Sequence, residues 1–133
     1  MPITVASPKA RDSIIKVIPI ARTDSTTEKC WLPRDAIVTG VFVHQATAAV
    51  TGAATFNLGW PGATTALLNA FSMPTSSVGF VTGGAATGTG VFTRLDTDRQ
   101  VIATYSVGTS TAGGTGFVVI QYFVAGPGET ILD

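Results

Sequence analysis

Few side chains in this sequence could carry catalytic chemistry. A nucleophile–His–acid arrangement would need His44, the one histidine, and a thiol nucleophile would need Cys30, the one cysteine. Asp96 and Asp98 lie two residues apart and could form a carboxylate pair for general acid–base catalysis. Each residue also has a structural explanation, as a neutral strand histidine, a small buried thiol or an aspartate that stabilises a turn. We favour the structural explanations and predict no catalytic site, which argues against an enzyme.

Metal, phosphate and sugar sites have little support either. One Cys and one His exclude a Cys/His zinc cluster, and two nearby aspartates supply too few oxygen ligands for calcium. The Gly-rich stretches 83–90 and 108–116 lack the Lys-Ser/Thr pair and the following helix of a phosphate-binding loop. Trp60 alternates with Phe56 and is expected in the core, whereas Trp31 is expected to be partly exposed and could stack on a sugar. We predict no metal and no cofactor.

The elements that position these side chains are expected to be β-strands. Thr, Ala and Gly are the commonest residue types, with 21, 17 and 15 copies in 133 residues, and no long stretch has helical apolar spacing. Short β-branched segments separated by Gly, Pro, Asn and Asp predict an all-β antiparallel sandwich or barrel of about eight strands. A short helix is plausible only at residues 63–71. The expected strands are residues 13–21, 30–32, 36–45, 55–60, 77–82, 91–95, 100–107 and 117–124.

Two of these segments, 36–45 and 117–124, are apolar on both faces. Strands of this kind are typically buried and central in a sheet, so we expect both to be central. Strict alternation along 36–45 places Val38, Phe42 and His44 on one face. The Gly-rich stretches named above are expected to be loops.

The chain length fits one domain with its own core. We predict an extended N-terminal arm at residues 1–12, a β-sandwich domain at 13–125 and a C-terminal tail at 126–133. The N-terminus lacks the pattern of a secretory signal, and no apolar run approaches the length needed to cross a bilayer. We therefore expect no membrane association.

The charges are few and unevenly distributed. Eight basic residues balance eight acidic ones, and ten of these sixteen lie within residues 1–35. Residues 36–93 and 100–128 contain no Lys, Arg, Asp or Glu. This pattern is unsuited to nucleic acid, which attracts clustered basic residues. It leaves two explanations open: a neutral, Thr-covered exterior, or faces buried against other subunits, because interface cores are depleted of charge.

Three segments carry a resemblance to a known family. Residues 32–41, LPRDAIVTGV, resemble the "LPxGAVVTGV" segment of small virion proteins of tailed bacteriophages. Residues 95–105, LDTDRQVIATY, are similar to their "LTADTPVTATY" segment, and residues 111–122, TAGGTGFVVIQY, to their closing "TAGxxxVVVEY" strand. The sequence departs from the pattern at Asp35, where the family has Gly, and at Gln121, where it has an acid.

The resemblance covers about residues 13–125 and implies a jelly-roll-like β-sandwich that decorates or cements the phage capsid, often as a trimer. It implies two partners, the major capsid protein and further copies of the chain, and a location on the outer surface of the virion. Because Arg is enriched at interfaces and charge is concentrated near the N-terminus, we predict that Lys9, Arg11, Arg22 and Arg34 contact the capsid.

Two other functions remain as alternatives. A phage head-fibre or tail receptor-binding module that recognises glycan would need exposed Trp or Tyr beside the loops at 83–90 or 108–116. A small sandwich hydrolase would need His44, Asp96 and Asp98 to converge in a cleft.

Overall fold

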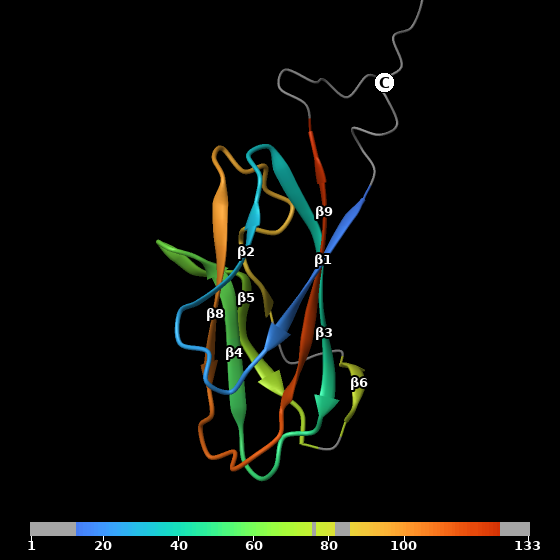
Figure 1. The fold of residues 1–133 in the computed structure, drawn as a ribbon, viewed down its shortest axis with the longest axis vertical. Coiled ribbons are helices and arrows are strands. Elements are labelled where there is room, and N and C mark those ends of the chain that lie inside the picture. The colour runs from blue at the N-terminus through green and yellow to red at the C-terminus, as the bar shows by residue number, and fades with distance from the viewer. Residues whose placement is uncertain (1–12, 76, 82–85, 126–133) are drawn as a thin grey trace, which may run out of the picture.

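The computed structural model describes residues 13–75, 77–81 and 86–125, which form two antiparallel β-sheets packed face to face (Figure 1). No described residue is helical, so this part of the chain holds no helix that could cross a membrane. The predicted arm at 1–12 and tail at 126–133 lie outside the described residues. The strands are β1 (Ile14–Ile20), β2 (Thr27–Leu32), β3 (Ala36–Thr47), β4 (Ala54–Trp60), β5 (Ala63–Met73), β6 (Gly79–Val81), β7 (Ala86–Thr87), β8 (Arg99–Ser106) and β9 (Thr115–Val124).

The strand order is that of a jelly roll. One sheet has four strands in the order β1-β9-β3-β6, and the other has five in the order β2-β8-β4-β5-β7. Leaving aside the two-residue β7, the chain forms four pairs, β1 with β2, β3 with β4, β5 with β6 and β8 with β9, with one strand of each pair in each sheet. The β8/β9 pair lies between the first two pairs, as in two joined Greek keys. The predicted all-β, jelly-roll-like sandwich is confirmed.

The core lies between the two sheets and consists of side chains that alternate inward along each strand. The largest fully buried apolar ones include Leu32, Phe56, Leu58, Leu67 and Ile120. Burying one side chain of this size contributes about 1.5–3 kcal/mol, so a few such contacts are comparable to the whole stability of a small domain. Trp60 is 7% exposed, which confirms its predicted place in the core.

Residues 63–71 belong to a strand, so the short helix considered there is wrong. β5 pairs antiparallel with β4, with Leu68 opposite Leu58 and Phe71 opposite Phe56. Leu67, Leu68 and Phe71 are all buried. The helix preference of Ala and Leu amounts to a fraction of a kcal/mol per residue, and burial against the other sheet outweighs it.

One loop prediction and one strand prediction also change. The Gly-rich stretch 83–90 contains β7, which pairs with β5 through Leu68 and Asn69. Residues 91–95, predicted as a strand, form only isolated bridges, in which Val91 pairs with Val38 and Arg94 with Ile37. The segment therefore lines the edge of the first half of β3, while β6 lines its second half.

A bulge in β3 changes which of its side chains share a face. Val38 pairs with Tyr122 and Gly40 pairs with Gln121, so Thr39 is an extra residue on β3. The extra residue reverses the alternation beyond this point. Val38 and Val43 both face the core, and Phe42 and His44 point outward. The prediction that Val38 shares a face with Phe42 and His44 is therefore wrong.

Candidate functional site

The outer face of the four-stranded sheet carries large apolar side chains that remain uncovered by the described part of the chain. Ile15, Val17, Phe42 and Phe80 are 60, 59, 48 and 63% exposed. Folded monomers rarely expose contiguous apolar patches of more than a few hundred Å², and such patches mark contact surfaces. We call this surface the apolar face. It consists of Ile15, Val17, Phe42, His44, Phe80, Phe117, Val119 and Gln121.

Strand register makes the apolar face continuous. Because the four strands are paired side by side, outward side chains at matching positions form rows across the sheet. Within the face, β9 supplies the middle of each row, between β1 on one side and β3 on the other. The rows are Ile15, Gln121 and Gly40; Val17, Val119 and Phe42; and Pro19, Phe117, His44 and Phe80.

His44 lies among aromatic rings in this face. Its ring stacks on Phe117, with centroids 4.5 Å apart and planes within 5°, and meets the ring of Phe80 edge-on at 4.9 Å. The buried Nδ1 of His44 has no hydrogen-bond partner among the described residues. Its surroundings are thus apolar, and its ring contacts are with Phe117 and Phe80 rather than with a carboxylate.

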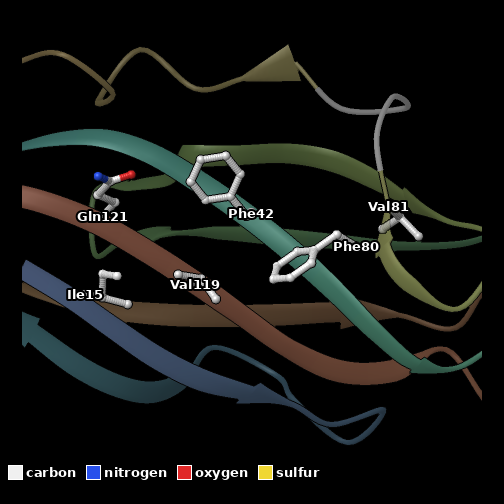
Figure 2. Close-up of a pocket in the computed structure, with 6 residues that line it drawn as sticks. All are labelled: Ile15, Phe42, Phe80, Val81, Val119 and Gln121. Atoms are coloured by element: carbon white, nitrogen blue, oxygen red, sulfur yellow. The ribbon is translucent and has the colours of Figure 1, made fainter.

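A shallow hollow of about 390 Å³ lies in the apolar face (Figure 2). Its lining residues are Ile15, Phe42, Phe80, Val81, Val119 and Gln121. The ring of Phe42 lies over Gly40, where an added Cβ would be 2.7 Å from the ring. Small-molecule sites combine apolar walls with a few convergent polar groups, and here Gln121 is the only polar lining residue. The hollow is better suited to an apolar protein surface.

The outer face of the five-stranded sheet is polar by comparison. Its outward positions include Thr55 and Asn57 on β4, Ser72 on β5 and Thr104 on β8. Asn57 lies directly opposite Thr104, and Thr55 opposite Ser72. The charge-poor sequence therefore forms two different surfaces: a Thr-rich polar exterior on one side of the sandwich and an apolar face on the other.

The predicted capsid-contact residues do not gather in one place. Lys9 and Arg11 lie outside the described residues. The half-buried guanidinium of Arg22 donates to Ser110 Oγ at 3.1 Å, to the Ser110 carbonyl at 2.8 Å and to the Gly113 carbonyl at 3.1 Å. Arg22 thus holds the β8–β9 loop, and its contact with a partner stays a prediction.

Arg34 lies at the opposite end of the sandwich from Arg22. Its side chain is exposed, and its backbone N–H donates to Asp98 Oδ1 at 2.8 Å. Other charges surround it, including an ion pair of Arg94 with Asp35 at 3.0 Å. We call this region the charged end; it comprises Arg34, Asp35, Arg94, Asp96, Asp98 and Arg99.

The catalytic candidates do not converge. Asp96 pairs with Arg99 at 3.0 Å, within the charged end. Ile37 bridges Arg94 at this end, and His44 lies seven residues further along β3, roughly 23 Å away at strand spacing. No three of the described His, Cys, Asp and Glu side chains are grouped so that they could hold a metal ion.

Cys30 lies half-buried on β2, close to the edge of the sandwich. Burial raises the pKa of the Cys30 thiol, and the charge of Lys16 opposes this rise. A raised pKa lowers the fraction of thiolate, which is the reactive form. The environment of this residue is therefore that of a packed thiol rather than of an activated nucleophile.

Beside the loop at 108–116, the described aromatic side chains do not form the pattern that the glycan alternative requires. Trp31 is 55% exposed, as predicted, but lies opposite Gln100 at the start of β8. The loop that follows Ser106 is about 20 Å further along this strand. Tyr105, which does lie beside that loop, is buried.

The apolar face was not predicted from the sequence. Segments 36–45 and 117–124 are expected to be central, which is confirmed for β3 and β9, but their second apolar side is not fully buried as the pattern suggests. A two-layered sandwich covers only one side of each sheet, so the second apolar side of these strands is exposed. The available signal was the edge segment 13–21, whose Ile15 and Val17 alternate with inward residues and so extend the same apolar side.

Comparison with solved structures finds a chain with a similar fold. No protein-family model and no curated protein matches this sequence. A chain from a solved structure described as "Cyanophage Pam1 capsid asymmetric unit" superposes with a TM-score of 0.65 over 93% of both chains. The two chains are 18% identical. They share a fold.

Proposed function

We propose that this protein is a structural protein of a tailed-phage virion that associates with the capsid as a decoration or cement subunit. The observation that carries the proposal is the jelly roll shared over 93% of the chain with a chain of a phage capsid unit. The sequence resemblance to small virion proteins, carried by segments 32–41, 95–105 and 111–122, supports it independently.

The proposed partners are the major capsid protein and further copies of this chain, arranged as a homotrimer on the outer surface of the virion. A symmetric shell repeats each contact many times, so weak contacts add through avidity. The exposed apolar face supports a role in permanent contact, because large uncovered apolar surface is costly for a free monomer.

The charged end supports a second, separate contact with the capsid. Ile14 pairs with Tyr122 and the Ala125 N–H donates to the Asp35 carbonyl, so the described chain begins and ends beside the charged end. The residues that lead into β1 include Lys9 and Arg11. We propose that these two residues and Arg34 contact the capsid. The main role of Arg22 is to hold the β8–β9 loop.

The test mixes the full chain with shells assembled from the major capsid protein alone and sediments them. The expected result is stoichiometric co-sedimentation of the protein with the shells. A double variant with Arg11→Ala and Arg34→Ala should bind less, whereas Thr104→Ala, on the polar side of the sandwich, should bind as wild type. Absence of wild-type binding to the shells contradicts the proposed function, and unchanged binding of the double variant contradicts the assignment of these arginines.

A further inference from the structure

We infer that the apolar face is the surface through which copies of this chain contact one another. The inference deepens the proposed function, since it rests on the proposal that the protein forms a homo-oligomer and names the surface that does so. Its basis is the charge and composition of this face.

The face is free of charge over its described extent. The nearest charged residue on its strands is Lys16 on β1, which alternates to the other side of the strand from Ile15 and Val17. Its Nζ donates to the backbone carbonyl of Trp31 on β2, in the opposite sheet. Selective contacts with a different protein commonly use complementary charge for steering and register, and this face offers none.

A second copy of the chain can cover such a face without burying an unpaired charge. Residues 36–93 and 100–128 contain no Lys, Arg, Asp or Glu, so much of the surface of a neighbouring copy is uncharged as well. Placing a charged surface over the apolar face would desolvate ions without pairing them, which costs several kcal/mol per ion. Interfaces between identical subunits are also more apolar than those between transient partners.

The area of the face limits how much of a contact it can supply. Its rows span five residues each on β1, β9 and β3, and β6 adds three residues. At about 3.3 Å per residue and about 4.8 Å between strands, the face presents roughly 300 Å². Standard interfaces bury ~800 Å² per partner, so a stable contact between copies includes further surface beside the face.

The test measures the mass of the free protein by sedimentation velocity and light scattering across a wide dilution series. Wild type should reach a multimer, with three times the 13.6 kDa of one chain as the expected mass. Phe42→Lys and Phe80→Lys each place a charge in the face and should weaken association by about tenfold or more. Thr104→Lys adds the same charge to the polar side of the other sheet and is the matched control, with association as in wild type.

Folding of each variant is checked by thermal melting, and both phenylalanines are exposed enough for the fold to tolerate the change. A wild-type monomer at every concentration overturns the inference, as does a multimer that Phe42→Lys and Phe80→Lys leave intact. These outcomes are independent of capsid binding. A monomer that still binds shells overturns the self-contact alone, and a multimer that never binds shells overturns the proposed function alone.

Discussion

At the scale of single residues, one internal cluster joins two loops at the end of the sandwich opposite the charged end. Arg22 donates three hydrogen bonds to Ser110 and Gly113, and its guanidinium carbon lies 5.8 Å from the ring centroid of Tyr105. The Tyr105 hydroxyl donates to the Gly114 carbonyl at 3.0 Å. The cluster adds side-chain contacts to a Gly-rich loop whose backbone also pairs with Val50 through an isolated bridge at Ala112.

Replacement of Arg22 tests this structural role. We expect Arg22→Ala to lower the free energy of unfolding by about 1–3 kcal/mol, because half-buried carbonyls lose charged hydrogen-bond donors. Arg34→Ala, at an exposed site, should change it by less than about 0.5 kcal/mol. Urea unfolding of the two variants and wild type measures the difference. Equal stabilities for all three would show that the loop does not depend on Arg22.

Tyr105 should make stability fall in alkaline solution. Burial raises the pKa of Tyr105, and the charge of Arg22 and its hydrogen bond oppose this rise. Below about pH 10 the phenol is protonated in both folded and unfolded chains, so pH has little effect through this group. As pH rises further, the phenol ionises first in the unfolded chain. This ionisation stabilises the unfolded state, so the free energy of unfolding falls.

The measurement compares unfolding of wild type and Tyr105→Phe at about pH 8 and about pH 10.5. At the lower pH the free energy of unfolding of the variant should be ~0.5–1.5 kcal/mol below that of wild type, because a hydrogen bond is missing. Between the two pH values its free energy of unfolding should fall by less than that of wild type. Burial also raises the pKa of Tyr122, so this residue should contribute to the alkaline fall in stability as well. Tyr122→Phe measures its share. Identical declines in wild type and Tyr105→Phe would assign the effect to other groups.

At the scale of elements, the turn between β2 and β3 shows how one backbone position joins the two sheets. Asp35 has φ of 70°, in the left-handed region that favours glycine. Its N–H donates to the Leu95 carbonyl and its own carbonyl accepts from Ala125, at 2.9 and 3.0 Å. The resembling virion proteins have Gly at this position, and the conformation explains why. Asp is among the few other residues that adopt it at modest cost.

Substitutions at Asp35 should therefore follow backbone conformation rather than charge. Asp35→Gly removes an exposed ion pair with Arg94, worth about 0–1 kcal/mol, and relieves the left-handed strain, so stability should stay within about 0.5 kcal/mol of wild type. Asp35→Val forces a β-branched residue into this region and should cost about 2 kcal/mol. Urea unfolding distinguishes them. A Gly variant as unstable as the Val variant would show that the ion pair, rather than φ, determines stability here.

The elements also show what the sequence could and could not predict. β4 was found from the alternation of its side chains and β9 from its apolar, β-branched composition. β5 was mistaken because Ala and Leu favour helix locally, while its pairing with β4 depends on residues distant in sequence. The prediction that Val38 and His44 share a face is wrong because a bulge at Thr39 arises from pairing with β9 and leaves no mark in the composition of β3. The apolar face was missed for a related reason, since exposure depends on how many layers the chain builds.

At the scale of the whole molecule, the sandwich separates two kinds of surface. The apolar face spans the outer side of the four-stranded sheet, and the charged end lies where β2 turns into β3 and β8 begins. The proposed self-contact uses the first surface and the proposed capsid contact uses the second. Because one is apolar and the other ionic, changes in solvent should affect them in opposite ways.

Salt concentration is the variable that separates these two contacts. The Debye length falls from about 10 Å at 0.1 M salt to about 3 Å at 1 M, so ionic contacts through Lys9, Arg11 and Arg34 should weaken. Burial of the apolar face involves no charge and is strengthened by excluded salts such as sulfate. One sulfate series, read by sedimentation of the free protein and by its occupancy on shells, should show a persisting multimer with falling occupancy. A multimer that dissociates as salt rises would mean that charged groups join the copies, and the apolar face would then have to be covered by the capsid itself.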